Sequence, residues 1–254
     1  MRKKLLYTIV LIIPIFIYCA CSAQSFKQNQ LKYSRVRQAY ENKQTQLEQL
    51  LRTKKLSFDS LELFIRAFKS EQIIEVWGKN KDDPAFVILR QYRFCATSGT
   101  LGPKRKEGDL QIPEGFYYIN SFNAWSSFHL SLKINYPNKS DRYFADKKSP
   151  GGDIYIHGAC CTIGCIPITD VKIEELYILC VEAKNSGQKQ IPVHIFPIEF
   201  TENKWLELQE NHSDSPSIIK FWKNLKQAYD SFINHRIPPS VRVNAKGVYL
   251  FSEY

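Results

Sequence analysis

The 254-residue chain lacks internal repeats and low-complexity tracts, and it has no apolar run of about 20 residues that would comfortably span a bilayer. It also lacks any DNA- or RNA-binding signature, although its formal net charge is +10. Nucleic acid is therefore not an expected partner, and we interpret the charge as attraction to an anionic surface such as a bacterial cell wall or a membrane. What is present is 44% hydrophobic residues, enough for one catalytic domain with appendages.

The N-terminus has the pattern of a secretory signal over residues 1–23. Basic residues at positions 2–4 precede an apolar run, Leu5–Tyr18, that ends in small residues. Two processing routes stay open, which are cleavage after Ala23 and lipid attachment at Cys21. We expect an exported protein of the periplasm or cell envelope, which meets the membrane only through this signal or a lipid anchor.

Cysteine is sparse, and its number is informative. Without Cys19 and Cys21, the seven cysteines become five, and an odd number in an oxidising compartment predicts a free, reactive thiol. The remaining five are Cys95, Cys160, Cys161, Cys165 and Cys180. For Cys160 and Cys161, packing or a bridge to Cys95 or Cys180 is favoured, and a redox exchange with Cys165 stays open. No second ligand pair completes a zinc tetrahedron, so we expect neither metal nor cofactor.

The hydrophobic pattern predicts an α+β protein with a helical segment over residues 24–70, a β-rich catalytic domain over 71–200, and a helical extension over 201–254 packed on it. Within the first segment, Ser57–Lys69 is predicted as an amphipathic helix. The predicted strands are Ile73–Trp77, Ala85–Phe94, Gly115–Phe122, Phe128–Tyr136, Ile154–Ile156 and Ile191–Pro197, and the predicted later helices are Asp170–Lys184 and Ser217–His235.

The segment IHGACCTIGCIPITD, residues 156–170, carries the chemistry. His157 is predicted to end a strand and Gly158 to turn the chain. The loop then returns to Gly164 and Cys165, just before a helix. A cysteine nucleophile needs a base and backbone amides that receive an oxyanion. We therefore predict Cys165 as nucleophile, His157 as base and the Gly164 and Cys165 amides as oxyanion donors.

Thr162 is predicted to orient this oxyanion loop, or to serve only as a turn hydroxyl. The alternative for Cys165 itself is a buried or disulfide-bonded residue without catalytic activity.

GGDIYIHG followed by TIGCIPITD resembles the signature of YkuD-type L,D-transpeptidases, and the short His-to-Cys loop is most similar to their YafK-like branch. The resemblance extends through LGPKRKEGD, IPEGFYYI, FHLSLKINYPN and FWKNLKQAYDSF, so that it covers about Ile73–Phe251. It implies a β-rich catalytic domain that forms a thioester on peptidoglycan stem peptides. It also places His129 near the cleft, as an accessory candidate.

Two positions depart from the larger transpeptidase class. Ile163 stands where that class usually has a second histidine, and Pro167 follows Ile166 where a polar or basic residue is common. The acceptor therefore stays open. An amine would make the protein a transpeptidase, whereas water would make it a hydrolase or amidase that cuts a peptidoglycan-linked peptide or lipoprotein. A wall-binding protein that has lost catalysis is the third reading.

Overall fold

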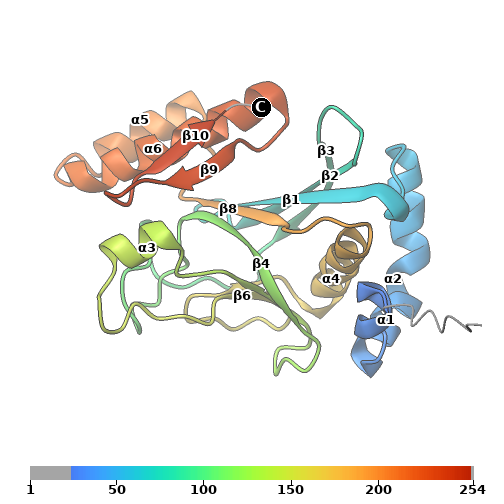
Figure 1. Ribbon diagram of the computed structural model, residues 1–254. Coiled ribbons are helices and arrows are strands. Elements are labelled where there is room, and N and C mark those ends of the chain that lie inside the picture. The colour runs from blue at the N-terminus through green and yellow to red at the C-terminus, as the bar shows by residue number, and fades with distance from the viewer. Residues whose placement is uncertain (1–23, 253–254) are drawn as a thin grey trace, which may run out of the picture.

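The computed structural model describes residues 24–252, so the predicted signal over residues 1–23 lies outside the described residues. One sheet of eight strands organises this region, in the order β3-β2-β1-β8-β4-β5-β6-β7 (Figure 1). Neighbouring strands run antiparallel except for the pairs β1–β8 and β6–β7. The strands are β1 (Leu61–Phe68), β2 (Ile73–Asn80), β3 (Val87–Arg93), β4 (Gly115–Asn123), β5 (Ser131–Ile134), β6 (Tyr155–His157), β7 (Ile166–Pro167) and β8 (Pro192–Phe196).

Helices cover both sides of this sheet, which confirms the predicted α+β class (Figure 1). On one side, α4 (Asp170–Asn185) is buried along most of its length, and α1 (Phe26–Gln30) and α2 (Ser34–Thr53) pack against it. Buried polar contacts fix the pairing of α2 with α4, because the Tyr40 hydroxyl donates to Glu182 Oε1 at 2.9 Å. The helix prediction for Asp170–Lys184 is thus confirmed.

The helix predicted over Ser57–Lys69 is wrong. Phe58–Ser60 forms one 3₁₀ turn (η1), and β1 follows as a strand hydrogen-bonded to β2 on one side and to β8 on the other. Seven of its eight residues are buried, Arg66 among them, so both faces are covered and the alternation of burial typical of a strand disappears. A short segment that is buried on both faces cannot be distinguished from a buried helix by its period.

The other predicted strands are present with shifted bounds. The largest change is at Phe128–Tyr136, where only Ser131–Ile134 is a strand. His129, at the start of that segment, has a φ of +69°, which is incompatible with an extended strand. A short helix, α3 (Lys139–Phe144), lies within the loop that leads to β6.

The C-terminal residues form a layer on the opposite side of the sheet from α4 (Figure 1). It consists of α5 (Glu202–Glu210), α6 (Pro216–His235) and a hairpin of β9 (Ser240–Val243) and β10 (Tyr249–Ser252). The helix predicted over Ser217–His235 is confirmed. Its apolar face, with Trp222 and Leu225, packs on Phe68, Phe116 and Phe196 of the sheet. Within residues 24–252, no helix is both long and apolar enough to cross a membrane.

Candidate active site

The two shortest strands, β6 and β7, bring the predicted histidine and cysteine to the same edge of the sheet. They pair in parallel, with Ile156 beside Ile166 and His157 beside Pro167. Cys165, one residue before β7, therefore lies beside Tyr155. Because alternate residues of a strand share a face, His157 lies on the same face as Tyr155 and Cys165. One detail of the prediction is wrong, since Cys165 precedes this strand rather than a helix, and α4 begins only at Asp170.

Two backbone groups contact the sulfur of Cys165. The Tyr155 N–H donates to Sγ at 3.4 Å, and the thiol donates to the carbonyl oxygen of Asp153 at 3.6 Å. Burial raises the pKa of the Cys165 thiol, and the Tyr155 amide opposes this shift because it favours the thiolate. The resting cysteine is therefore a thiol, held by the segment that leads into β6.

His157 is buried, with 1% of its surface exposed. Its ring lies against that of Phe128, at 4.6 Å between centroids, and its Nδ1 is hydrogen-bonded to the carbonyl of Gly158. Burial lowers the pKa of His157, and the bond to Gly158 acts in the opposite direction. Since Nδ1 must carry the hydrogen to donate to a carbonyl, Nε2 is the basic nitrogen. His157 is thus a neutral imidazole with one free acceptor, as a general base requires.

No hydrogen bond joins His157 to Cys165 within residues 24–252, because the thiol is directed at Asp153 instead. Contacts of this kind are often long or misdirected before substrate binds. Transfer of the proton to His157 requires a rotation of the thiol away from the Asp153 carbonyl. The structure therefore places the two side chains on one face without the contact that chemistry would need.

Thr162 holds the loop before Cys165. Its Oγ1 accepts the N–H groups of Gly164 at 3.1 Å and Cys165 at 2.8 Å, and it donates to the Cys165 carbonyl at 2.8 Å. The two amides predicted as oxyanion donors are thus engaged by Thr162. Gly164 has a φ of +134°, and a Cβ there would meet the Gln111 carbonyl at 3.0 Å, so only glycine fits this position.

Two residues that support the site were not singled out from the sequence. Phe128 stacks on His157, and Asp170 Oδ1 accepts the Ala159 N–H at 2.7 Å, which ties the start of the loop to α4. Gly158 lies between them, where a Cβ would come within 2.8 Å of the Phe128 carbonyl. Phe128 precedes His157 by 29 positions, so that only the fold brings it there.

The part of the chain that carries this site matches a known protein family. Residues 63–195, which run from within β1 to within β8 and contain the whole candidate site, match the YkuD family, the L,D-transpeptidase catalytic domain. The chain belongs to the YkuD L,D-transpeptidase family.

One relative supports the assignment of this L,D-transpeptidase domain, and two solved structures are given for comparison. The chain is 33% identical over 194 residues to YafK of Escherichia coli K12, described as a candidate L,D-transpeptidase, covering 75% of this chain and 74% of that protein. Its fold is similar to that of the helical cell shape determining protein Pgp2 from Campylobacter jejuni, at a TM-score of 0.44 and 18% identity over 73% of this chain and 74% of that one. L,D-transpeptidase 1 of Mycobacterium tuberculosis is also similar, at a TM-score of 0.30 and 15% identity over 53% and 62% of the two chains.

The bonds of His129 in the L,D-transpeptidase domain are made to two helices and do not involve Cys165 or His157. Its Nε2 is hydrogen-bonded to Glu174 Oε1 of α4 at 2.9 Å, and its carbonyl accepts from Arg35 of α2 at 2.6 Å. Its ring is thus bonded to a helix, whereas its neighbour Phe128 contacts His157. These bonds support a structural role in which His129 fixes the segment that carries Phe128.

A disulfide between Cys95 and Cys160 joins the loop after β3 to the loop between β6 and β7 of the L,D-transpeptidase domain. The sequence left Cys95 and Cys180 open as partners, and Cys95 is the one bonded, since Cys180 is free and buried within α4. Cys165 is free, as the odd number predicted, but Cys161 is also free and is exposed. Among residues 24–252 no group of three or more His, Cys, Asp and Glu side chains is arranged to hold a metal ion.

Proposed function

We propose that the chain is an exported cysteine acyltransferase that acts on peptidoglycan stem peptides, with Cys165 as nucleophile and His157 as base. The observation that carries this proposal is the pairing of a neutral, acceptor-bearing His157 with a free thiol on one face of β6 and β7, inside an L,D-transpeptidase domain. Residues 1–23 are proposed as its secretory signal.

The chemistry follows from the protonation states. His157 Nε2 takes the thiol proton while Cys165 Sγ attacks the carbonyl of the stem peptide's diaminopimelate residue. The C–S bond forms, the peptide C–N bond breaks, and His157 returns the proton to the leaving amine. A second amine then attacks the thioester, forms a new amide and releases the thiol, which completes transpeptidation.

The tetrahedral oxyanion needs an N–H donor that is free at the moment of attack. The Tyr155 amide donates to Sγ, and this bond weakens as Sγ bonds to the carbonyl carbon, so the amide is then released as the donor nearest the reacting atoms. The amides of Gly164 and Cys165 serve only if Thr162 releases them. We therefore propose Tyr155 N–H as the first oxyanion donor and Thr162 as the residue that sets the Cys165 backbone.

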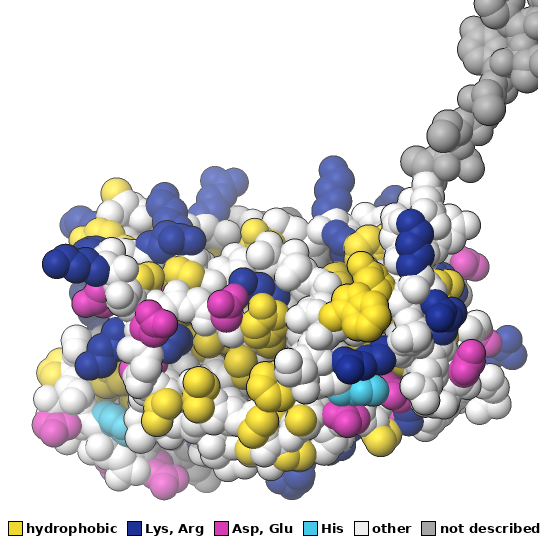
Figure 2. Space-filling view, turned by 90° about the horizontal axis from the view of Figure 1, so that it is seen from below, with side chains coloured by type: hydrophobic (Ala, Val, Ile, Leu, Met, Phe, Trp, Pro, Cys, Tyr) yellow, Lys and Arg dark blue, Asp and Glu magenta, His cyan; other side chains and the backbone are white. Residues whose placement is uncertain are grey.

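Apolar surface next to the site is available for substrate. Phe128, Ile163 and Val171 are 41%, 78% and 57% exposed on the segments that build the site. The face shown in Figure 2 carries several patches of hydrophobic side chains, with Lys and Arg side chains, and fewer Asp and Glu side chains, around and between them. Such a surface fits a substrate with apolar stems and carboxylates.

Covalent labelling with a carbapenem tests the nucleophile. The purified protein is incubated with the β-lactam, and the adduct is located by mass spectrometry. We expect a single adduct at Cys165, none in Cys165→Ala, and an unchanged adduct in Cys161→Ser, because Cys161 is the exposed free thiol of the same loop. An unlabelled Cys165 in reduced, folded protein would contradict the proposal. It would favour the alternative of a wall-binding protein that has lost catalysis.

A second experiment tests the acceptor. Purified protein is incubated with defined tetrapeptide muropeptides, with and without a lipoprotein-linked species. Crosslinked dimers support the proposed transpeptidase, whereas release of the linked peptide without a new amide would replace it by a hydrolase.

A further inference from the structure

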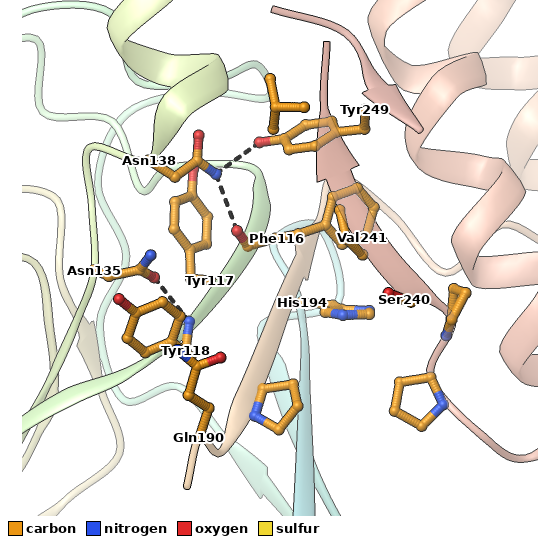
Figure 3. A pocket seen from close by; sticks show the side chains of 14 residues that line it. Phe116, Tyr117, Tyr118, Asn135, Asn138, Gln190, His194, Ser240, Val241 and Tyr249 are labelled. Atoms are coloured by element: carbon orange, nitrogen blue, oxygen red, sulfur yellow. Dashed lines mark hydrogen bonds between the residues drawn. The ribbon is translucent and has the colours of Figure 1, made fainter. Parts of the chain in front are cut away.

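A cavity of about 480 Å³ lies between the sheet and the C-terminal hairpin (Figure 3). Its walls come from β4 and β8 on one side and from β9 and β10 on the other. None of the 14 residues that line it belongs to the catalytic segment 153–165. The size falls within the ordinary range of small-molecule sites, and the site is separate from Cys165.

His194 is the buried polar group in this cavity. It occupies the middle of β8, between Arg66 of β1 and Phe116 of β4 in the strand register, and it is 3% exposed. The rings of Phe64 and Phe116 lie edge-on to it at 4.6 and 4.7 Å. Its Nδ1 has no hydrogen-bond partner among the residues that the structure describes. A buried nitrogen without a partner costs free energy. This nitrogen has almost no accessible surface, so a ligand would bond it and remove that cost only after the ring turns it toward the cavity.

Other polar groups of the cavity are also free. Asn135 uses Oδ1 to accept the Tyr118 N–H at 2.8 Å and leaves its Nδ2 unused, and the Tyr118 hydroxyl, the Gln190 amide and the Ser240 hydroxyl have no hydrogen bond within residues 24–252. Figure 3 shows Asn135, Tyr118 and Gln190 on one side and His194 and Ser240 on the other. Hydrogen-bonding groups therefore face the space from two sides.

The cavity carries no formal charge. No Lys, Arg, Asp or Glu lines it. Burial, with a smaller contribution from the Arg66 guanidinium, lowers the pKa of His194 to about 3, so its ring is neutral under physiological conditions. A phosphate, carboxylate or ammonium group would lose its hydration there without gaining a counter-ion. The ligand that fits is uncharged, with hydroxyl or amide groups and an apolar surface for the aromatic walls.

We propose that this cavity binds an uncharged sugar of the N-acetylated amino sugar type. A sugar ring supplies hydroxyl donors and acceptors for His194, Asn135 and Ser240, and C–H faces for the aromatic side chains. That the sugar belongs to the glycan strand of peptidoglycan rests on the proposed function. A free stem peptide is disfavoured because its carboxylates and ammonium groups find no counter-charge in the cavity.

Isothermal titration of the purified protein with the β-1,4-linked trimer of N-acetylglucosamine tests the proposal. We expect saturable binding by the wild-type protein and by Ser213→Trp, an exposed control in the turn between α5 and α6. Ser240→Trp, at the exposed wall of the cavity, should weaken binding at least tenfold because the indole fills the space. Equal binding by the two tryptophan variants, or no saturation of the wild-type protein, would overturn the proposal. Preferential binding of a free tetrapeptide would also overturn it.

His194→Phe separates a ligand contact from mere packing. The substitution keeps an aromatic ring beside Phe64 and Phe116 and removes the unpartnered nitrogen, so the protein should fold with an equal or higher Tm. If His194 bonds the sugar, affinity falls about tenfold, the equivalent of one hydrogen bond. Unchanged affinity in this variant would show that the ring only packs.

Failure of this proposal can be distinguished from failure of the enzyme proposal. Cys165→Ala should bind the trimer normally, because Cys165 does not line the cavity. Carbapenem labelling without sugar binding overturns the sugar site alone. Sugar binding without labelling overturns the acyltransferase and leaves the cavity as a glycan-binding site.

Discussion

The two histidines His157 and His194 are both buried and neutral, yet they lie in regions built in different ways. Around His157, the positions of the loops are set by hydrogen bonds that two backbone amides donate to Thr162 and that the Ala159 amide donates to Asp170, and by the Cys95–Cys160 disulfide. Around His194, aromatic rings of β1, β4 and β8 pack against the imidazole at the wall of the cavity. Directed bonds fix the few atoms that react, whereas aromatic packing supplies stability with less constraint on individual polar groups.

The largest expected effect is the loss of chemistry without loss of stability in Cys165→Ala. We expect muropeptide turnover to fall by at least about 10³-fold, because no other group can form the thioester. The melting temperature should change little, since a half-buried thiol is replaced by a smaller group. Cys161→Ser is the matched control and should keep full turnover. Comparable turnover by Cys165→Ala would refute the assigned nucleophile.

In the C-terminal layer we expect the opposite result, which is a loss of stability without a loss of chemistry. Trp222 is fully buried, and its Nε1 donates to the buried carboxylate of Glu114 at 2.7 Å, which is paired with Lys69 at 3.0 Å. Trp222→Ala should destabilise the protein by about 3–5 kcal/mol in urea unfolding. Trp222→Phe keeps most of the ring and should lose less. Carbapenem labelling of the folded fraction should stay near normal, and a strong loss would mean that the two regions are coupled.

A smaller effect on rate is expected from Thr162→Val. Valine keeps the shape but removes the acceptor for the Gly164 and Cys165 amides and the donor to the Cys165 carbonyl. Acylation should slow by about 10- to 100-fold, since misplacing the nucleophile costs a few kcal/mol of transition-state stabilisation. Thr162→Ser keeps the hydroxyl and should recover most of the rate. Equal rates for the serine and valine variants would show that the hydroxyl has no role in positioning.

The pH dependence of acylation tests whether His157 and Cys165 are both neutral before the reaction. Burial lowers the pKa of His157, so the ring remains a base at pH values at which an ordinary histidine, with a pKa of about 6.5, is already half protonated. The labelling rate should therefore hold down to about pH 6.5 and fall only in more acid solution. A rate that already falls with acid well above pH 6.5 would contradict this, because it would indicate a histidine whose pKa is raised and which is protonated more easily than a buried ring.

The smallest effect is on the pH dependence of stability. Because the pKa of His194 is lowered to about 3 in the folded protein, the unfolded chain binds more protons between about pH 6.5 and pH 3. Its contribution to stability is therefore present above pH 6.5 and is lost as the pH falls through this window. Urea unfolding at several pH values should show a weaker acid loss in His194→Phe than in the wild-type protein. Parallel curves would mean that His194 is accessible to protons in the folded state.

Most of the sheet could be predicted from the sequence where one face of a strand is polar or where Gly and Pro mark its ends, as at Gly115–Phe122. The prediction failed at Leu61–Phe68, because a strand in the middle of a sheet that is covered on both sides loses its alternation. It failed again at Phe128 and His129, where a residue of positive φ ends what composition alone shows as a strand. In both cases the conformation of the segment is set by the parts of the chain that pack against it, and the sequence of the segment alone does not show this.

The sequence by itself indicated that the chain returns from His157 to bring Cys165 to the same edge of the sheet, because the two residues are eight positions apart with glycines beside them. Only the tertiary structure decided which groups surround them. Phe128 reaches His157, and Cys95 reaches Cys160. The cavity at His194 was equally invisible, since its walls come from strands over 100 positions apart in the chain. Such contacts depend on chain folding over long separations, and no local pattern records them.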